Sequence, residues 1–160
     1  MTDLLRCKKP FLDTSVFLAA INNEQQAAEG SVRAEVAAQI FKAAERKEID
    51  LFSSSLVAAE IIYKKGSLTL SEESEPAIDE YLNNSHRPLW VDVDYSLAVD
   101  ARKIVRRNGL QAADALHLAA AVRAGSDILL RWDRKFNALT TIDGVRVTDP
   151  YWYGARELEL

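Results

Sequence analysis

Four carboxylates in this chain lie where apolar neighbours make a negative charge costly to bury. They are Asp13 after the apolar residues 10–12, Glu60 within 56–62, Asp114 near the start of 113–119, and Asp133 after 128–132. An ionised acid in such surroundings needs a positive partner. If the four converge, a divalent cation would compensate them together, because Mg²⁺ and Mn²⁺ prefer hard oxygen ligands. The residues therefore predict one acidic metal site.

The elements that must position these acids follow from the hydrophobic pattern. Strands are expected at 10–12, 50–52, 89–93, 127–131 and 145–147, and helices directly after Asp13, at 32–47, around Glu60, within 67–87, at 94–107 and at 112–124. This alternation predicts an α/β fold with a mostly parallel sheet. Ligands of such sheets bind outside the carboxyl ends of the strands. Asp13 and Asp133 each follow a strand and should share that edge. Asp114, in the first turn of a helix, and Glu60, in the middle of one, can point towards it.

Local residues set the ends of two expected helices. Any one of Ser53, Ser54 and Ser55 can cap the helix that carries Glu60. Asp94 is a candidate cap for the helix that follows it, and Gly109 is suited to closing that helix in the left-handed conformation.

Composition favours one soluble domain spanning residues 1–160. The chain is 48% hydrophobic and 28% charged, which is ordinary for a globular protein with a real core. It has no apolar run long enough to span a bilayer. The start of the chain does not follow the pattern of a secretory signal, and a single cysteine, Cys7, cannot form an internal disulfide, so a cytoplasmic location is expected. The net charge of −4 argues against strong non-specific nucleic-acid binding, and basic residues such as those within 102–107 are expected on solvated helix faces.

Four sequence motifs together resemble those of PIN (PilT N-terminus) domains. They are Asp13-Thr14-Ser15, Glu60 after a Ser-rich turn, Asp114-Ala115-Leu116-His117-Leu118-Ala119-Ala120-Ala121, and Asp133-Arg134-Lys135-Phe136. The likeness is greatest to VapC-type toxins of toxin–antitoxin systems and covers nearly the whole chain. It implies a single three-layer α/β/α domain with a mostly parallel central sheet. The polar helical segment at about 67–87 would then be an insertion or an element that faces a dimer mate or partner.

The resemblance also implies an activity. PIN toxins of this type are metal-dependent endoribonucleases that hydrolyse RNA phosphodiester bonds, here with Mg²⁺ or Mn²⁺. Asp13, Glu60, Asp114 and Asp133 match the family's acidic quartet, with Asp13 and Asp114 expected as direct metal ligands. The implied partners are an RNA substrate, a cognate antitoxin protein and a second copy in a homodimer, with no membrane.

One position departs from the family pattern. PIN domains usually have Thr or Ser two residues before the last Asp, whereas this chain has Arg131. A guanidinium cannot accept a hydrogen bond, but it can pair with a phosphate or with the acids themselves. This departure puts the catalytic rate, or activity itself, in question. Ser15 can support the site by binding a ligand or a water, or it can simply cap a helix. His117, one turn after Asp114, is interpreted as a packed or surface histidine rather than a base.

Other functions remain open at this point. Each acid alone reads as a helix cap, a residue at a helix start or a surface residue. A catalytically weak or inactive PIN module that binds RNA or a protein partner is one alternative, indicated by Arg131. A phosphatase of the haloacid-dehalogenase type is another, with Asp13 as nucleophile. That class requires a second Asp two positions later, where this chain has Ser15.

Overall fold

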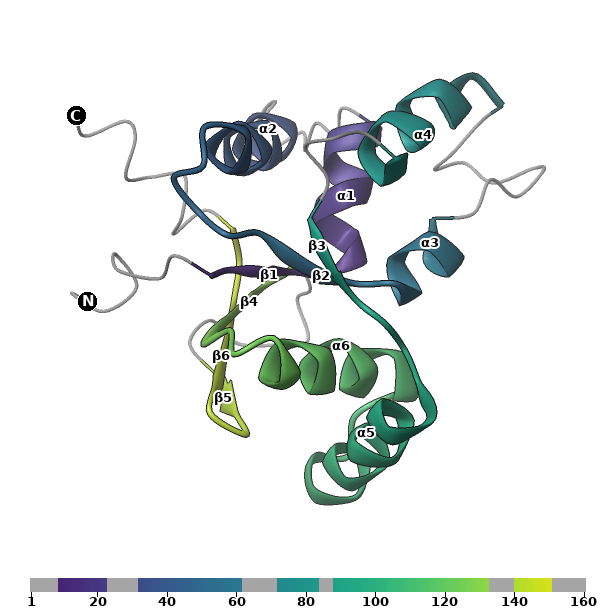
Figure 1. The fold of residues 1–160 in the computed structure, drawn as a ribbon, viewed down its shortest axis with the longest axis vertical. Helices are drawn as coiled ribbons and strands as arrows, with labels where there is room; N and C mark the ends of the chain where they lie inside the picture. Colours follow the sequence, from purple (N-terminus) through teal and green to yellow (C-terminus); the bar gives the residue numbers. More distant parts are fainter. Residues whose placement is uncertain (1–8, 23–31, 62–71, 84–87, 133–139, 151–160) are drawn as a thin grey trace.

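Six strands form one sheet in the order β3-β2-β1-β4-β6-β5 (Figure 1). The structure is a computed structural model that describes residues 9–22, 32–61, 72–83, 88–132 and 140–150. The strands are β1 Phe11–Leu12, β2 Phe52–Ser54, β3 Leu89–Val91, β4 Ile128–Leu130, β5 Thr140–Ile142 and β6 Val145–Thr148. Every neighbouring pair is parallel except β5 and β6. The predicted, mostly parallel sheet is therefore confirmed.

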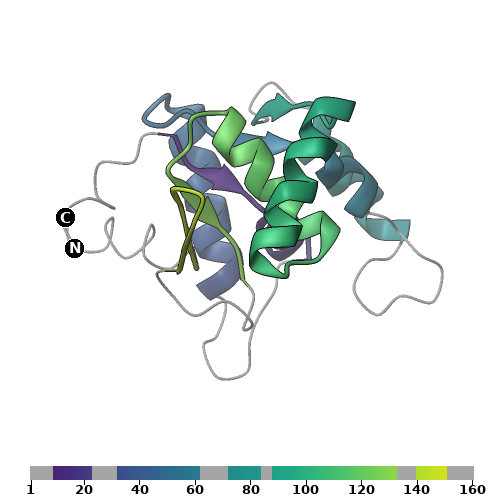
Figure 2. The same cartoon turned by 90° about the horizontal axis from the view of Figure 1, so that it is seen from below.

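Helices cover both faces of this sheet. They are α1 Thr14–Ile21, α2 Val32–Glu45, α3 Leu56–Glu60, the 3₁₀ turn η2 Glu72–Ser74, α4 Glu75–Asn83, α5 Tyr95–Asn108 and α6 Ala112–Arg123. Helices α1, α2 and α4 lie on one face, and α5 and α6 lie on the other (Figure 1). Figure 2 shows α5 and α6 side by side against the sheet. The three-layer architecture is confirmed, and within the described ranges no helix is long and apolar enough to cross a membrane.

The central strands divide their side chains between two hydrophobic cores. Leu12 and Leu130 pack into the core beneath α1 and α2, while Phe11 and Leu129 pack into the core beneath α5 and α6. Successive strand residues point to opposite faces, so a strand buried on both sides is apolar throughout. All four side chains are fully buried. This packing explains why the apolar runs before Asp13 and Asp133 carry no alternation.

The second strand lies later than the sequence predicted. A strand at 50–52 was expected, but β2 runs from Phe52 to Ser54. Ser53 is fully buried and its Oγ donates to the carbonyl oxygen of Leu12 at 2.8 Å, so its hydroxyl is satisfied inside the sheet. Ser54 Oγ accepts a hydrogen bond from Leu56 N at 3.0 Å, at the start of α3. The N-cap position of α3 is Ser55, one of the three predicted serines, but its side chain makes no capping hydrogen bond; the hydroxyl that contacts the start of the helix belongs to Ser54, the last residue of β2.

Strand β5 was not predicted from the sequence. It pairs with β6 through a tight turn at Asp143 and Gly144, which both have positive φ angles, 50° and 82°. A two-residue turn of this kind suits the twist of antiparallel strands. The Asp-Gly pair was the available signal, and Thr140-Thr141 before it gave no apolar run to mark a strand.

The predicted ends of α5 are confirmed. Asp94 caps it, with Oδ1 accepting from Leu97 N at 2.7 Å. Gly109 closes it with a φ of 67°, and its N–H donates to Val105 O at 2.8 Å. The part of the polar segment that the structure describes, α4, packs on the domain through Ile78 and through Tyr81, whose ring lies 4.8 Å from that of Phe41. That this segment is an insertion stays a prediction.

Candidate acidic site at the carboxyl edge of the sheet

The backbone brings two site residues to one edge of the sheet. Asp13 N donates to Leu130 O at 3.0 Å, and Arg131 N donates to Thr148 O at 3.0 Å. Both bonds continue the parallel pairing one residue beyond the strands. Asp13 and Arg131 therefore leave neighbouring strands at the carboxyl edge, where parallel sheets bind ligands.

Asp13 both caps a helix and faces the site. Its Oδ2 accepts from Ser15 N at 3.1 Å, which makes it the N-cap of α1. Its Oδ1 lies 3.7 Å from Nε2 of His117, and the residue is only 7% exposed. One oxygen of Asp13 therefore caps the helix, while the other faces His117.

Glu60 is the last residue of α3, whereas the sequence placed it in the middle of a helix. Its Oε2 lies 2.8 Å from Nε2 of His117 and also accepts a hydrogen bond from Thr14 Oγ1. Asp13 and Glu60, which are far apart in sequence, therefore approach the same nitrogen atom. The structure brings these two predicted site residues together.

His117 is the residue that joins them, and the sequence did not assign it this place. It is 1% exposed, so it is packed as expected, but Nε2 faces Asp13, Glu60 and, at 3.3 Å, Thr14 Oγ1. Its Nδ1 has no hydrogen-bond partner in the described part of the chain. The available signal was its position three residues after Asp114, on the same side of α6.

The hydrogen bonds stabilise the charged form of Glu60. Partial burial by itself raises the pKa of this carboxyl. The hydrogen bonds from His117 and Thr14, together with the electrostatic attraction of His117 and Arg131, outweigh burial, so the pKa lies below the ordinary value of 4.5. Glu60 is therefore held as a carboxylate. Thr14 was expected only as part of the Asp13-Thr14-Ser15 motif, but it donates one of these hydrogen bonds.

Asp114 pairs with Arg131 and not with His117. Its Oδ1 lies 3.1 Å from Nη1 of Arg131, and the two side chains are 24% and 7% exposed. Asp114 stands in the first turn of α6, as predicted. Arg131, the departure from the family pattern, thus contacts one of the four predicted acids directly.

Two further predicted residues have different outcomes. Ser15 Oγ accepts from Trp132 N at 3.0 Å, so its hydroxyl ties α1 to the segment after β4, while Asp13 is the residue that caps. Asp133 lies outside the described residues. That all four acids form one cluster stays a prediction.

The donor set fits a divalent cation chemically, but each described acid already has a partner within the chain. Asp13, Glu60 and Asp114 supply the carboxylate oxygens that Mg²⁺ and Mn²⁺ prefer. In the ranges that the structure describes, no group of three or more His, Cys, Asp or Glu side chains is arranged to hold a metal ion. Glu60 is instead contacted by His117 and Thr14, and Asp114 by Arg131.

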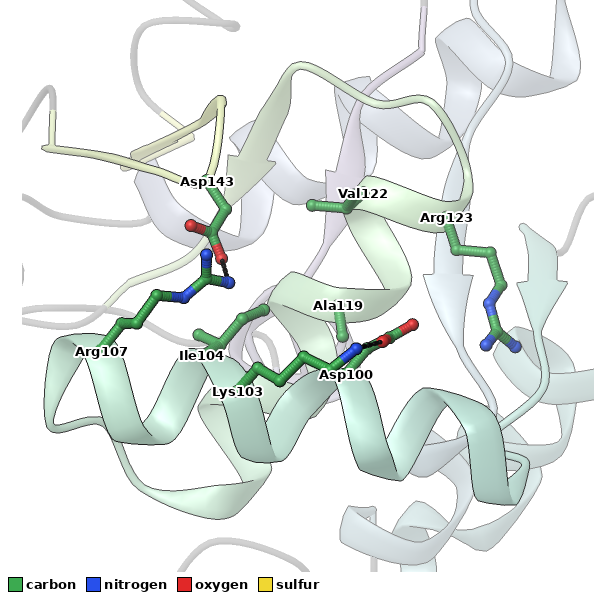
Figure 3. A pocket seen from close by; sticks show the side chains of 8 residues that line it. All are labelled: Asp100, Lys103, Ile104, Arg107, Ala119, Val122, Arg123 and Asp143. Atoms are coloured by element: carbon green, nitrogen blue, oxygen red, sulfur yellow. Dashed lines mark hydrogen bonds and ion pairs between the residues drawn. The ribbon is translucent and has the colours of Figure 1, made fainter.

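A hollow of about 550 Å³ lies elsewhere, between α5, α6 and the β5–β6 turn (Figure 3). It is lined by Asp100, Lys103, Ile104, Arg107, Ala119, Val122, Arg123 and Asp143. Arg107 pairs with Asp143 at 2.8 Å and Lys103 pairs with Asp100 at 3.0 Å. The basic residues of 102–107 are exposed on α5, as expected for a solvated helix face. Asp13, Glu60 and Asp114, the predicted acids that the structure describes, do not line this hollow.

Comparisons with known proteins bear on the fold. Solved structures of the same fold include VapBC2 from Rickettsia felis bound to a promoter DNA fragment, with a TM-score of 0.61 and 18% identity over 88% of this chain and 98% of that one. Mycobacterium tuberculosis VapC20, described as a Sarcin-Ricin loop cleaving toxin, has a TM-score of 0.62 and 18% identity over 86% and 98%. DNA-bound VapBC from Salmonella typhimurium has a TM-score of 0.58 and 21% identity over 89% and 98%.

At these identities the likeness shows the fold. No curated protein matches the sequence. The model of the PIN domain family matches residues 11–141, which is most of the chain. This chain therefore belongs to the PIN domain family.

Proposed function

We propose that this PIN domain is a divalent-metal-dependent endoribonuclease and the toxin of a toxin–antitoxin pair. The observation that carries the proposal is the convergence of Asp13 and Glu60 on His117 at the carboxyl edge of the sheet. Asp13 is oriented as a helix cap, and hydrogen bonds orient Glu60 and favour its charged form. A hard cation binds carboxylate oxygens that are oriented in this way. The VapC and VapBC structures that share the fold support the toxin assignment.

In this proposal Asp13, Glu60, Asp114 and Asp133 hold Mg²⁺ or Mn²⁺, with Asp13 and Asp114 as direct ligands. When bound, the ion lowers the pKa of a water and offsets charge on the phosphoryl oxygens. The chain's own residues orient the acids. The Ser15 N–H fixes one oxygen of Asp13, and the Thr14 hydroxyl fixes Glu60.

The proposed partners follow from the same relatives. An RNA is the substrate class, as in the toxin described as cleaving the sarcin–ricin loop. An antitoxin is proposed because two of the similar structures are VapBC assemblies on DNA. A homodimer is proposed from the family resemblance, with the helical part of the domain as its interface.

The first test is RNA cleavage by the purified protein, free of antitoxin, with Mg²⁺ or Mn²⁺. We expect wild type to cleave structured RNA and Asp114→Asn to be slower by at least about tenfold, the minimum typical of disturbed metal-site residues. Asp100→Asn is the matched control, because it makes the same chemical change at an exposed acid paired with Lys103. Loss of activity in both variants alike would contradict a specific role for Asp114.

Metal binding can be measured without RNA. Calorimetric titration with Mn²⁺ should give saturable binding that weakens in Asp13→Asn and not in Asp100→Asn. Binding that Asp13→Asn leaves unchanged would contradict the shared site.

A second function is favoured by one observation, the pairing of Arg131 with Asp114. A PIN domain whose acid is neutralised by its own arginine can serve as a non-catalytic module that binds RNA or a protein. This alternative holds if the protein binds RNA or a partner but cleaves nothing with either metal.

A further inference from the structure

We infer that Arg131 is a built-in counter-cation of Asp114, whose positive charge opposes the binding of a divalent ion to that carboxylate. The inference rests on the proposed metal site and adds a device that sets the affinity of that site. The residue responsible is the one that departs from the family pattern.

The position of Arg131 is fixed by the backbone on both sides of its Cα. Its own N–H donates to Thr148 O at 3.0 Å, and the N–H of the next residue, Trp132, donates to Ser15 Oγ at 3.0 Å. The side chain is 7% exposed, so it is buried at the edge of the sheet and does not sweep through solvent. The guanidinium is thus held against Asp114.

The guanidinium and a metal ion compete for the same carboxylate. Nη1 of Arg131 lies 3.1 Å from Oδ1 of Asp114. Each carboxylate oxygen can take more than one partner, so the competition is one of charge: the ion pair already offsets the negative charge that would attract a divalent cation. Two positive charges at one carboxylate also repel each other, and in a largely buried site this repulsion is screened less than in water.

The usual Thr or Ser at the position of Arg131 carries no charge and would impose no such competition. The inference therefore predicts that metal affinity in this chain is set low by a single side chain.

Calorimetric titration of the full chain with Mn²⁺ tests this directly. We expect Arg131→Gln, which removes the charge and retains an amide donor, to bind Mn²⁺ at least about tenfold more tightly than wild type, or about 1.4 kcal/mol. Arg131→Lys keeps the charge and should bind within a few-fold of wild type. Arg131→Thr is a second neutral variant of smaller volume, and circular dichroism confirms that each variant is folded.

The double variant Arg131→Gln with Asp114→Asn shows whether the gain passes through Asp114. We expect the gain to be largely lost there, because the freed carboxylate is then absent. A gain that persists in this variant, or neutral variants that bind no more tightly than wild type, overturns the inference while leaving the metal site standing. Absence of Mn²⁺ binding in wild type and in every variant contradicts the proposed metal site itself, and the inference with it.

Discussion

At the scale of residues, the site is built from acids that each have a donor within the chain. Asp13 accepts from the Ser15 N–H, Glu60 contacts His117 and Thr14, and Asp114 forms an ion pair with Arg131. For Glu60 these contacts lower the pKa of the carboxyl, so they favour the charged form that burial alone would disfavour. The same bonds hold the acids in fixed orientations before any ligand arrives.

His117 is expected to position Glu60. In metal-free buffer, His117→Leu removes one of the two hydrogen bonds that Glu60 accepts and should lower the free energy of unfolding by about 1–3 kcal/mol, the range for a hydrogen bond to a charged group. His117→Gln, which retains a donor near Nε2, should restore part of the loss. Urea unfolding measures both. Equal loss in the two variants would indicate packing alone.

The same variant changes how stability depends on pH. In wild type the folded pKa of Glu60 lies below 4.5, so its contribution is present above pH 4.5 and is lost as the pH falls through the folded value. His117→Leu leaves burial to raise that pKa, so this loss should move to higher pH. Urea midpoints measured on both sides of pH 4.5 test the shift, and identical pH profiles would contradict it.

At the scale of elements, the predicted site residues that the structure describes lie at the ends of helices and strands. Asp13 begins α1 at the end of β1, Glu60 ends α3, and Asp114 lies in the first turn of α6. The ends of these elements therefore place Asp13 and Glu60 beside His117, and Asp114 beside Arg131. The loop between α5 and α6 matters because it sets where α6 begins.

Gly109 is expected to be essential for that loop's conformation. Its φ is 67°, and no atom lies within 4 Å of an added Cβ, so Gly109→Ala is opposed only by the left-handed backbone. The free energy of unfolding should fall by about 1 kcal/mol. Gly109→Asn should cost less, because asparagine tolerates this conformation better. Chemical denaturation distinguishes them, and an Ala variant as stable as wild type would contradict this account.

At the scale of the whole molecule, one sheet serves two cores. Leu129 faces α5 and α6, and Leu130 faces the core beneath α1 and α2. Because both side chains stand on the same strand, neither core can be lost without disturbing the other. The molecule should therefore unfold as one cooperative unit.

Truncation on either face tests this. Leu129→Ala and Leu130→Ala remove fully buried side chains, and each should cost about 2–5 kcal/mol. Val122→Ala, at a residue 48% exposed, should cost far less. Trp90 and Trp132 pack against the first core, so their fluorescence reports on that core, whereas far-ultraviolet circular dichroism reports on the backbone of the whole domain. Both signals should shift together in each variant, and separate transitions would refute a single unit.

The sequence by itself determined the order of the elements other than β5, the mostly parallel sheet and the family motifs. Apolar runs such as 128–130 and the capping pair Asp94 and Gly109 act locally, so their consequences can be derived from neighbours in the chain. The same pattern misplaced β2, because Ser53 is polar in type but is buried by a bond to the Leu12 carbonyl in another strand. Strand β5 was missed because it depends on pairing with β6 rather than on its own composition.

Only the tertiary structure decided which side chains meet. The approach of Asp13 and Glu60 to His117, and the pairing of Arg131 with Asp114, join residues separated by long stretches of chain. No local propensity encodes such distances, since they follow from strand order and from the helix ends that the sheet positions. The sequence named the acids, and the fold determined which partner within the chain each acid has.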